Sequence, residues 1–127
     1  MGEKYLIDTN VVIDFFGIKL SGPAEEFVSF LEPSISVITH IELFCSNDLT
    51  PSEIGKLDKY ISAARIFNHI DGEIIDHAIE IRKNYKIKLP DAIIAATAIS
   101  NDMTLISSNK KDFGKVTGLK FLDPNDI

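Results

Sequence analysis

The chain has 127 residues, of which 45% are hydrophobic and 25% charged, and its formal net charge is −6. These values are ordinary for a soluble globular protein, so we expect residues 1–127 to form a single domain. No apolar run approaches the roughly 18 residues of a membrane span, and the N-terminus lacks the pattern of a secretory signal. The single cysteine, Cys45, excludes an internal disulfide. We therefore expect a cytoplasmic protein with no membrane partner.

Charge is distributed unevenly along the sequence. Residues 1–81 hold 5 Lys or Arg and 14 Asp or Glu, a net charge of −9, whereas residues 82–127 hold 8 and 5, a net charge of +3. The overall acidity argues mildly against a nucleic-acid partner, but a basic local surface suits a phosphate backbone. The candidates for such contacts are Arg82, Lys110 and Lys111, with a solvated face as the alternative.

The first part of the chain is predicted to alternate short strands with helices. A continuous apolar run predicts a buried strand over residues 4–8, followed by a short helix capped by Thr9 or Asn10. A second helix begins near Pro23, and alternation of polar and apolar residues predicts a second strand over residues 34–38.

Two further helices carry N-terminal signals. Thr39 is a suitable N-cap, and Glu42 follows at the spacing of a capping box, so Glu42 is either a cap or a site acid. Thr50 and Glu53 show the same spacing around a proline at the first helical position. The later elements are predicted to be a short strand, a helix capped by Asp71, an alanine-rich helix begun by Pro90 and two strands, over residues 66–70, 72–86, 89–99, 103–106 and 119–122. This alternation predicts a parallel sheet with helices on both faces.

Acidic side chains follow several predicted elements. Asp8 ends the first strand, Glu42 lies just beyond the second, Asp112 follows the strand over 103–106, and Asp91 opens a helix. The carboxyl ends of parallel strands share one edge of a sheet, so the first three are expected to converge there. Two carboxylates about 5 Å apart repel by roughly 3 kcal/mol at a dielectric constant of about 20. Such a cluster needs a cation or raised pKa values, and its oxygen ligands suit Mg²⁺ or Mn²⁺ rather than zinc.

Four motifs stand in order along the chain: Leu6-Ile7-Asp8-Thr9-Asn10-Val11, Thr39-His40-Ile41-Glu42, Leu89-Pro90-Asp91-Ala92-Ile93-Ile94-Ala95-Ala96-Thr97-Ala98, and Leu105-Ile106-Ser107-Ser108-Asn109-Lys110-Lys111-Asp112-Phe113. Together they resemble the motifs of PIN-domain ribonucleases, above all the VapC-type toxins of toxin–antitoxin pairs. The resemblance spans the whole chain, and the third motif is the most specific. It implies an α/β fold, the PIN-like three-layer α/β/α sandwich with a mostly parallel central sheet.

The resemblance also implies which acids act. It makes Asp8, Glu42 and Asp91 catalytic carboxylates that bind metal. The fourth position falls on Asn109, where many relatives have Asp. Other relatives have Asn there and keep the downstream acid, as this chain does with Asp112, so Asn109 and Asp112 are both candidate metal ligands and Asp112 a candidate catalytic residue.

Two hydroxyls are expected to support this site. Thr9 and Ser107 are candidates to orient ligands or water from behind the metal-binding acids. Ser107 stands where relatives commonly have Thr, which keeps the hydroxyl group.

The implied function is metal-assisted hydrolysis of an RNA phosphodiester, with one or two Mg²⁺ or Mn²⁺ ions and a 5′-phosphate product. The resemblance further implies a cognate antitoxin protein that covers the acidic site. It also implies a homodimer, for which the apolar faces within residues 11–16 or 54–64 are candidates.

Two other functions fit parts of the pattern. Asn109, where an acid is common, would suit a non-catalytic PIN-like module that binds RNA or protein. A haloacid-dehalogenase-type phosphatase would use Asp8 as its nucleophile. That family has a second acid two residues further on, where this chain has Asn10.

Overall fold

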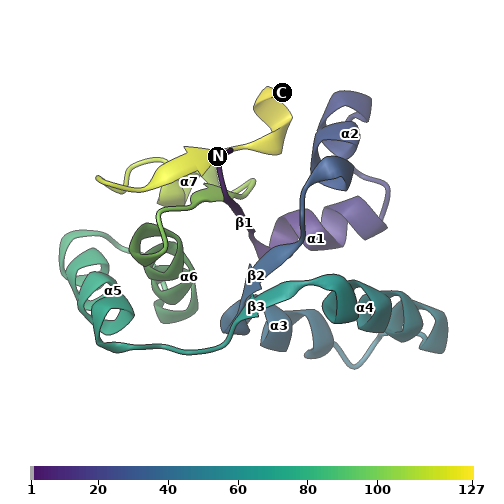
Figure 1. Ribbon diagram of the computed structural model, residues 1–127, viewed down its shortest axis with the longest axis horizontal. Coiled ribbons are helices and arrows are strands. Elements are labelled where there is room, and N and C mark those ends of the chain that lie inside the picture. Colours follow the sequence, from purple (N-terminus) through teal and green to yellow (C-terminus); the bar gives the residue numbers. More distant parts are fainter. Residues whose placement is uncertain (1) are drawn as a thin grey trace.

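The computed structural model describes residues 2–127, in which five short strands lie between helices on both faces (Figure 1). The strands are β1 (Tyr5–Ile7), β2 (Ser34–Ser36), β3 (Arg65–Phe67), β4 (Thr104–Ile106) and β5 (Lys120–Leu122). The α-helices are α1 (Thr9–Phe16), α2 (Gly22–Phe30), α3 (Val37–Phe44), α4 (Pro51–Ala63), α5 (Gly72–Asn84), α6 (Leu89–Ser100) and α7 (Lys110–Phe113), followed by a 3₁₀ turn, η1 (Pro124–Asp126). The predicted three-layer α/β/α sandwich is confirmed.

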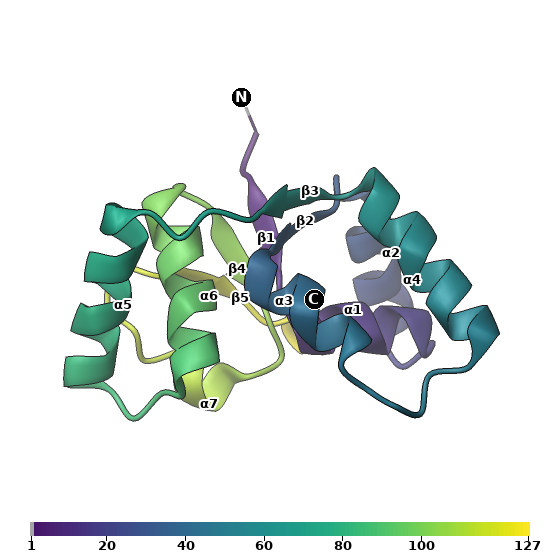
Figure 2. The same cartoon turned by 90° about the horizontal axis from the view of Figure 1, so that it is seen from below.

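The strands pair in parallel throughout. β4 lies between β1 and β5, and β2 pairs with β3. β1 and β2 lie side by side but share no ladder, so the strands follow the order β3-β2-β1-β4-β5 across the molecule. Paired strands therefore end on the same side, and in Figure 2 β1 runs downward from the N-terminus and leads into α1.

Two hydrophobic clusters form the core, and β1 belongs to both. Leu6 packs into the cluster made with α5, α6 and β4, whereas Ile7 packs into the cluster made with α1, α2, α3 and α4. The cause is the pleat, which sends successive side chains to opposite faces of a sheet. The alanines of α6 let this helix lie close to the sheet, because four of them are completely buried: Ala92, Ala95, Ala96 and Ala98.

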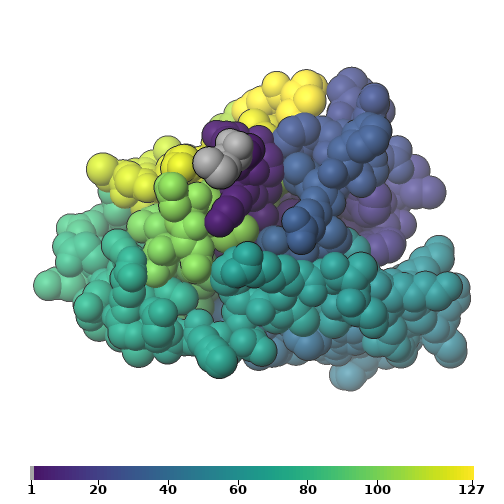
Figure 3. Space-filling view, viewed as in Figure 1, coloured from purple at the N-terminus to yellow at the C-terminus, as the bar shows by residue number. Residues whose placement is uncertain are grey.

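Residues from the middle of the chain cover part of the molecular surface. In the space-filling view, residues 50–84 (teal) form a band across the lower part of this face (Figure 3). Within residues 2–127, no helix is long and apolar enough to cross a membrane. Cys45 is exposed just after α3.

A helix cap explains why the boundary between β2 and α3 differs from the one predicted from the sequence. The predicted strand over 34–38 stops at Ser36, because the Ser36 hydroxyl accepts a hydrogen bond from the Thr39 N–H and thereby caps α3. Thr39 consequently lies inside the helix, and its predicted capping box with Glu42 is wrong. The capping box of Thr50 and Glu53 is confirmed, with both of its hydrogen bonds present.

Replacing Thr50 by Ala should lower the free energy of unfolding by about 1 kcal/mol, because the first turn of α4 loses its side-chain acceptor. Urea unfolding followed by circular dichroism measures this change. Ser52→Ala, at an exposed position of the same turn, is the matched control and should change stability little. A Thr50 variant as stable as the native chain would contradict the role of this cap.

Candidate functional site

Asp8 is the most buried acid of the predicted site, with 4% of its surface exposed. Its Oδ1 accepts a hydrogen bond of 2.8 Å from the Thr9 N–H, and its Oδ2 accepts one of 2.7 Å from Ser107 Oγ. Asp8 itself is the N-cap of α1, so the prediction of Thr9 or Asn10 as cap is wrong. Asp8 has little contact with water, but the positive end of the α1 dipole stabilises its carboxylate.

Ser107 fixes the other side of Asp8. It follows β4, and its N–H donates to the Leu122 carbonyl at the end of β5. While Ser107 Oγ donates to Asp8, it accepts a 3.0 Å hydrogen bond from the Asn109 N–H. The Ser107 hydroxyl, which the sequence analysis expected to support the site, therefore contacts Asp8 directly and joins it to the loop after β4.

Glu42 lies on α3 and is held toward α1. Thr9 Oγ1 donates a 2.6 Å hydrogen bond to Glu42 Oε1 and lies 3.1 Å from the buried Thr39 Oγ1. Glu42 is thus no helix cap, and its carboxylate belongs to the acidic end of the sheet. Thr39, which the sequence reading used only as a cap, forms part of this contact and was missed.

Asn109 and Asp112 form a reciprocal pair at α7. Asn109 Nδ2 donates to Asp112 Oδ2 over 3.1 Å, and the Asp112 N–H donates to Asn109 Oδ1 over 3.3 Å. Asn109 is the N-cap of this short helix. The amide is therefore engaged in orienting Asp112, and Asp112 is the charged member of the pair.

The charges of Glu42, Asp91 and Asp112 affect the pKa of Asp8 or of Asp91, so these four acids lie near one another. Burial raises the pKa of Asp8 to about 6; hydrogen bonds from Ser107 and Thr9 oppose the shift, and the charges of Asp91 and Glu42 add to it. Burial also raises the pKa of Asp91, in the first turn of α6, and the charges of Glu42 and Asp112 act in the same direction. Two groups with raised pKa values in one cluster are characteristic of a functional site.

A divalent cation suits this set of side chains chemically. Within the described residues, none of the four acids forms an ion pair with Lys, Arg or His, so no salt bridge offsets their repulsion. All the charged donors are carboxylate oxygens, the ligands that Mg²⁺ and Mn²⁺ prefer. Among residues 2–127, however, no three Asp, Glu, His or Cys side chains stand close enough to hold an ion as they lie. Binding an ion would have to draw the acids together.

The predicted RNA-binding residues differ in how they are engaged. Arg82 Nη1 donates a 2.7 Å hydrogen bond to the Ile87 carbonyl, which ties α5 to the loop before α6. Lys110 Nζ pairs with Asp126 Oδ2 at 2.7 Å. Lys111 is exposed and forms no ion pair within residues 2–127. Lys88, the N-cap residue of α6, lies near the site, because its charge lowers the pKa of Asp91.

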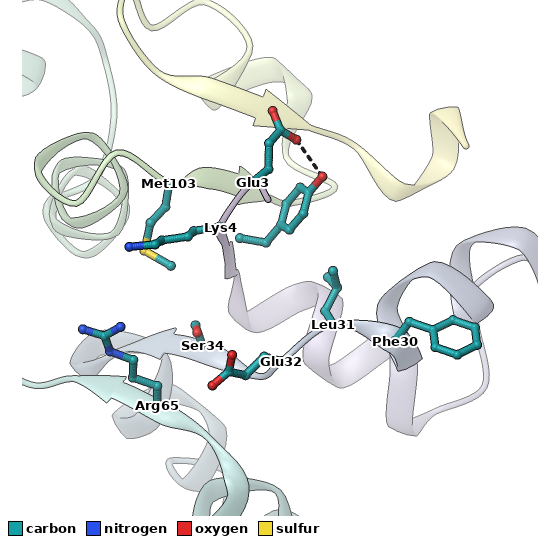
Figure 4. Close-up of a pocket in the computed structure, with 9 residues that line it drawn as sticks. Glu3, Lys4, Phe30, Leu31, Glu32, Ser34, Arg65 and Met103 are labelled. Carbon is teal, nitrogen blue, oxygen red and sulfur yellow. Dashed lines mark hydrogen bonds between the residues drawn. The ribbon is translucent and has the colours of Figure 1, made fainter. Parts of the chain in front are cut away.

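Two hollows flank the sheet. A groove of about 370 Å³ lies beside Glu42 and is lined mainly by apolar residues of α1, α3 and α4, among them Ile13, Phe16 and Leu57. A second hollow, of about 300 Å³, lies at the opposite edge, where the strands begin (Figure 4). There, Lys4 immediately precedes β1 and Arg65 begins β3, and neither the four acids nor Ser107 lines the hollow.

A parallel sheet with acids gathered beyond its strand ends defines an α/β protein with its site at the carboxyl edge. The chain belongs to the PIN domain family, whose model matches residues 5–119. No curated protein matches the chain closely enough to be counted as a relative.

Several solved structures resemble the chain over nearly its whole length. A toxin–antitoxin complex from Klebsiella pneumoniae is 30% identical, with a TM-score of 0.75, over 95% of this chain and 98% of that chain. VapBC-1 from nontypeable Haemophilus influenzae is 25% identical, with a TM-score of 0.76, over 94% and 97%. DNA-bound VapBC from Salmonella typhimurium, at 22% identity and a TM-score of 0.78 over 97% and 99%, shows the fold alone.

The buried charge of Asp8 should destabilise the metal-free protein at neutral pH. The pKa of Asp8 is about 6 in the folded chain and about 3.8 when solvated, so at pH values between these two the folded state binds the proton more tightly than the unfolded state. The free energy of unfolding therefore falls as pH rises from about 3.8 to about 6. Asp8→Asn should therefore raise the free energy of unfolding at pH 7 by roughly 2–3 kcal/mol.

Thermal unfolding in the presence of a chelator, at pH values from 4 to 7, measures this effect. The advantage of Asp8→Asn should shrink toward pH 4, where the native carboxyl is also neutral. Asp58→Asn, at an exposed acid of α4, is the control and should show no such trend. An Asp8 variant less stable than the native chain at pH 7 would refute the argument.

Proposed function

We propose that the chain is a Mg²⁺- or Mn²⁺-dependent endoribonuclease and the toxin of a toxin–antitoxin pair. The observation that carries this proposal is the mutual effect of Asp8, Glu42, Asp91 and Asp112 at one edge of the sheet, with no cationic side chain paired to them in the described residues. Membership of the PIN family and the relatives solved as toxin–antitoxin complexes support it.

Asp8, Glu42, Asp91 and Asp112 would hold the ion, and their repulsion is what its charge would relieve. A bound ion would supply an activated water and stabilise the negative charge that develops on the scissile phosphate. Ser107 and the Thr9 N–H keep the Asp8 carboxylate in place, and the Thr9 hydroxyl does the same for Glu42. These contacts restrain the orientation of the Asp8 and Glu42 carboxylates before an ion binds.

The Asn109 and Asp112 pair assigns different roles to two residues that the sequence left unresolved. Because the Asn109 amide bonds both the backbone and the carboxylate of Asp112, we assign it a positioning role. Asp112 is then the fourth acid of the site. The absence of a charge at Asn109 is therefore compatible with an enzyme, and the non-catalytic module stays as the alternative.

The antitoxin is proposed to cover the acidic edge. The apolar groove beside Glu42 adjoins that edge, so a partner segment bound in this groove would block access to the carboxylates. A basic side chain in the same segment would meet acids that form no ion pair in the described residues, which would give the complex both apolar burial and charge complementarity.

Cleavage should disappear when the charge of either central acid is removed. In Asp8→Asn and Asp91→Asn, hydrolysis of a fluorogenic single-stranded RNA in the presence of Mn²⁺ should fall at least about 100-fold, because the site no longer stabilises the transition-state charge. Chelation of the metal should abolish the native activity. Asp102→Asn, which affects an exposed acid paired with Lys120, is the control.

Full activity in both variants would refute the enzyme. Retained RNA binding without Mn²⁺ binding in calorimetry, and without cleavage by the native chain, would favour the non-catalytic module. Hydrolysis of a generic phosphate monoester that depends on Asp8 alone would revive the phosphatase interpretation.

Lys111 should contact the RNA backbone, because it is exposed beside the acid-bearing α7 and forms no ion pair in the described residues. Lys111→Gln should weaken RNA binding and reduce the salt dependence of log K by about one phosphate contact. Filter binding by the cleavage-deficient Asp8→Asn chain at several salt concentrations measures both. Lys115→Gln, just beyond α7, is the matched control, and equal effects of the two substitutions would contradict a specific contact.

A further inference from the structure

A chain of three hydroxyl groups runs from the end of β2 to the carboxylate of Glu42. Ser36 Oγ lies 3.5 Å from Thr39 Oγ1, and Thr39 Oγ1 lies 3.1 Å from Thr9 Oγ1. Thr9 Oγ1 in turn lies 2.6 Å from Glu42 Oε1. Ser36 and Thr39 are completely buried, and a buried hydroxyl destabilises a protein unless it forms hydrogen bonds. These two residues therefore depend on this chain for their side-chain hydrogen bonds.

The direction of each hydrogen bond follows from the acid at the end of the chain. A carboxylate only accepts hydrogen bonds, so the single proton of the Thr9 hydroxyl is donated to Glu42. Thr9 Oγ1 has no second proton, and the Thr39 hydroxyl must therefore donate to it. Ser36 Oγ accepts from the Thr39 N–H, which leaves its own proton for Thr39 Oγ1. All three protons thus point toward Glu42, and hydrogen bonds aligned in this way polarise and strengthen one another.

The hydroxyl chain crosses the gap in the sheet between β1 and β2. These strands lie side by side without a backbone ladder, and α1 and α3, which follow them, contact each other (Figure 2). Within residues 2–127, the hydrogen bonds between α1 and α3 are those of Thr9 with Thr39 and Glu42. Asp8 stands on one side of this gap and Glu42 on the other. The hydroxyl chain therefore joins the two parts of the molecule that carry these acids.

Thr97 shows the ordinary hydrogen bond of a buried threonine in a helix. Its hydroxyl donates to the Ile93 carbonyl of its own helix, α6, and so joins no other element. Thr39 is equally buried, yet its hydroxyl lies against Thr9 of α1. The hydrogen bonds of Thr39 go to Ser36 and Thr9 and not to Glu42, although Glu42 is on the same helix. An effect of the Thr39 hydroxyl on that carboxylate must therefore pass through Thr9.

We propose that Thr39 is a positioning residue, whose hydroxyl holds the Thr9 hydroxyl against the Glu42 carboxylate. Ser36 restrains Thr39 in turn. Because Glu42 is exposed, water competes for its carboxylate, and a donor fixed from behind keeps it turned toward α1. The effect on a bound ion rests on the proposed function, in which Glu42 is one of the ligands. Residues that orient a metal ligand in this way contribute to metal affinity without touching the ion.

Isothermal titration calorimetry of the purified full chain with Mn²⁺ measures this contribution. Thr39→Val removes the hydroxyl and keeps the branched shape, so it should raise the dissociation constant for Mn²⁺ by about three- to tenfold. Thr39→Ser keeps the hydroxyl and should stay within about twofold of the native value. Thr97→Val is the matched control, because it removes an equally buried hydroxyl and should leave the affinity unchanged. Circular dichroism verifies that each variant is folded.

A double-mutant cycle distinguishes this positioning role from a merely structural one. In a chain that carries Thr9→Val, the addition of Thr39→Val should not weaken Mn²⁺ binding further, because the residue that transmits the effect is already lost. Urea unfolding of the metal-free protein provides a second readout. There, the combined effect of the two substitutions on the unfolding equilibrium constant should be smaller than the product of their separate effects by about threefold or more.

Independent effects of the two substitutions in either measurement would overturn the proposal. Native affinity for Mn²⁺ in Thr39→Val would do so as well, as would equal losses in Thr39→Val and Thr39→Ser. A native chain that binds no Mn²⁺ would instead contradict the metal-dependent function. In that case the coupling measured in the metal-free protein still decides whether Thr39 holds Thr9 in place.

Discussion

The carboxylate of Asp8 is buried at the end of β1 and has no cationic partner among the described residues, which makes its environment the central constraint on this edge of the molecule. Two hydrogen bonds hold it, one from the first turn of α1 and one from Ser107 after β4. The hydrogen bond from Ser107 depends on the parallel register that sets Ile7 beside Ile106. The sheet thus holds the Asp8 carboxylate in place. This buried charge destabilises the folded state as long as no cation pairs with it.

Much of the architecture follows from local sequence signals. Alternation of short apolar runs with capped, amphipathic segments is enough to predict a parallel sheet between helices, and Thr50 with Glu53 locates the start of α4 to the residue. The start of α3 was misplaced because two hydroxyls, Ser36 and Thr39, compete for one cap. The sequence offers no means of choosing between them, since the choice depends on where β2 must end to pair with β3.

The candidate site, too, has features that the sequence predicts and features that it does not. That Asp8, Glu42 and Asp112 lie toward one edge was predictable, because strand ends in a parallel sheet share an edge, but among residues 2–127 no three such acids stand close enough to hold an ion. The structure adds pairings that depend on loop shape: Asn109 with Asp112, and Lys110 with Asp126. Those contacts join residues whose relative placement no periodicity encodes. They also change the expected role of Lys110, whose ammonium group is occupied by the C-terminal turn.

The division of β1 between the two core clusters has a consequence for how the molecule opens. Leu6 belongs to the cluster under α5 and α6, and its neighbour Ile7 belongs to the cluster under the other helices. β4, the neighbour of β1 in the ladder, is divided in the same way, with Leu105 in the first cluster and Ile106 in the second, so the paired strands join both clusters. The amide protons of β1 should then exchange with solvent only through global unfolding, so the slowest-exchanging backbone lies directly beside the buried carboxylate.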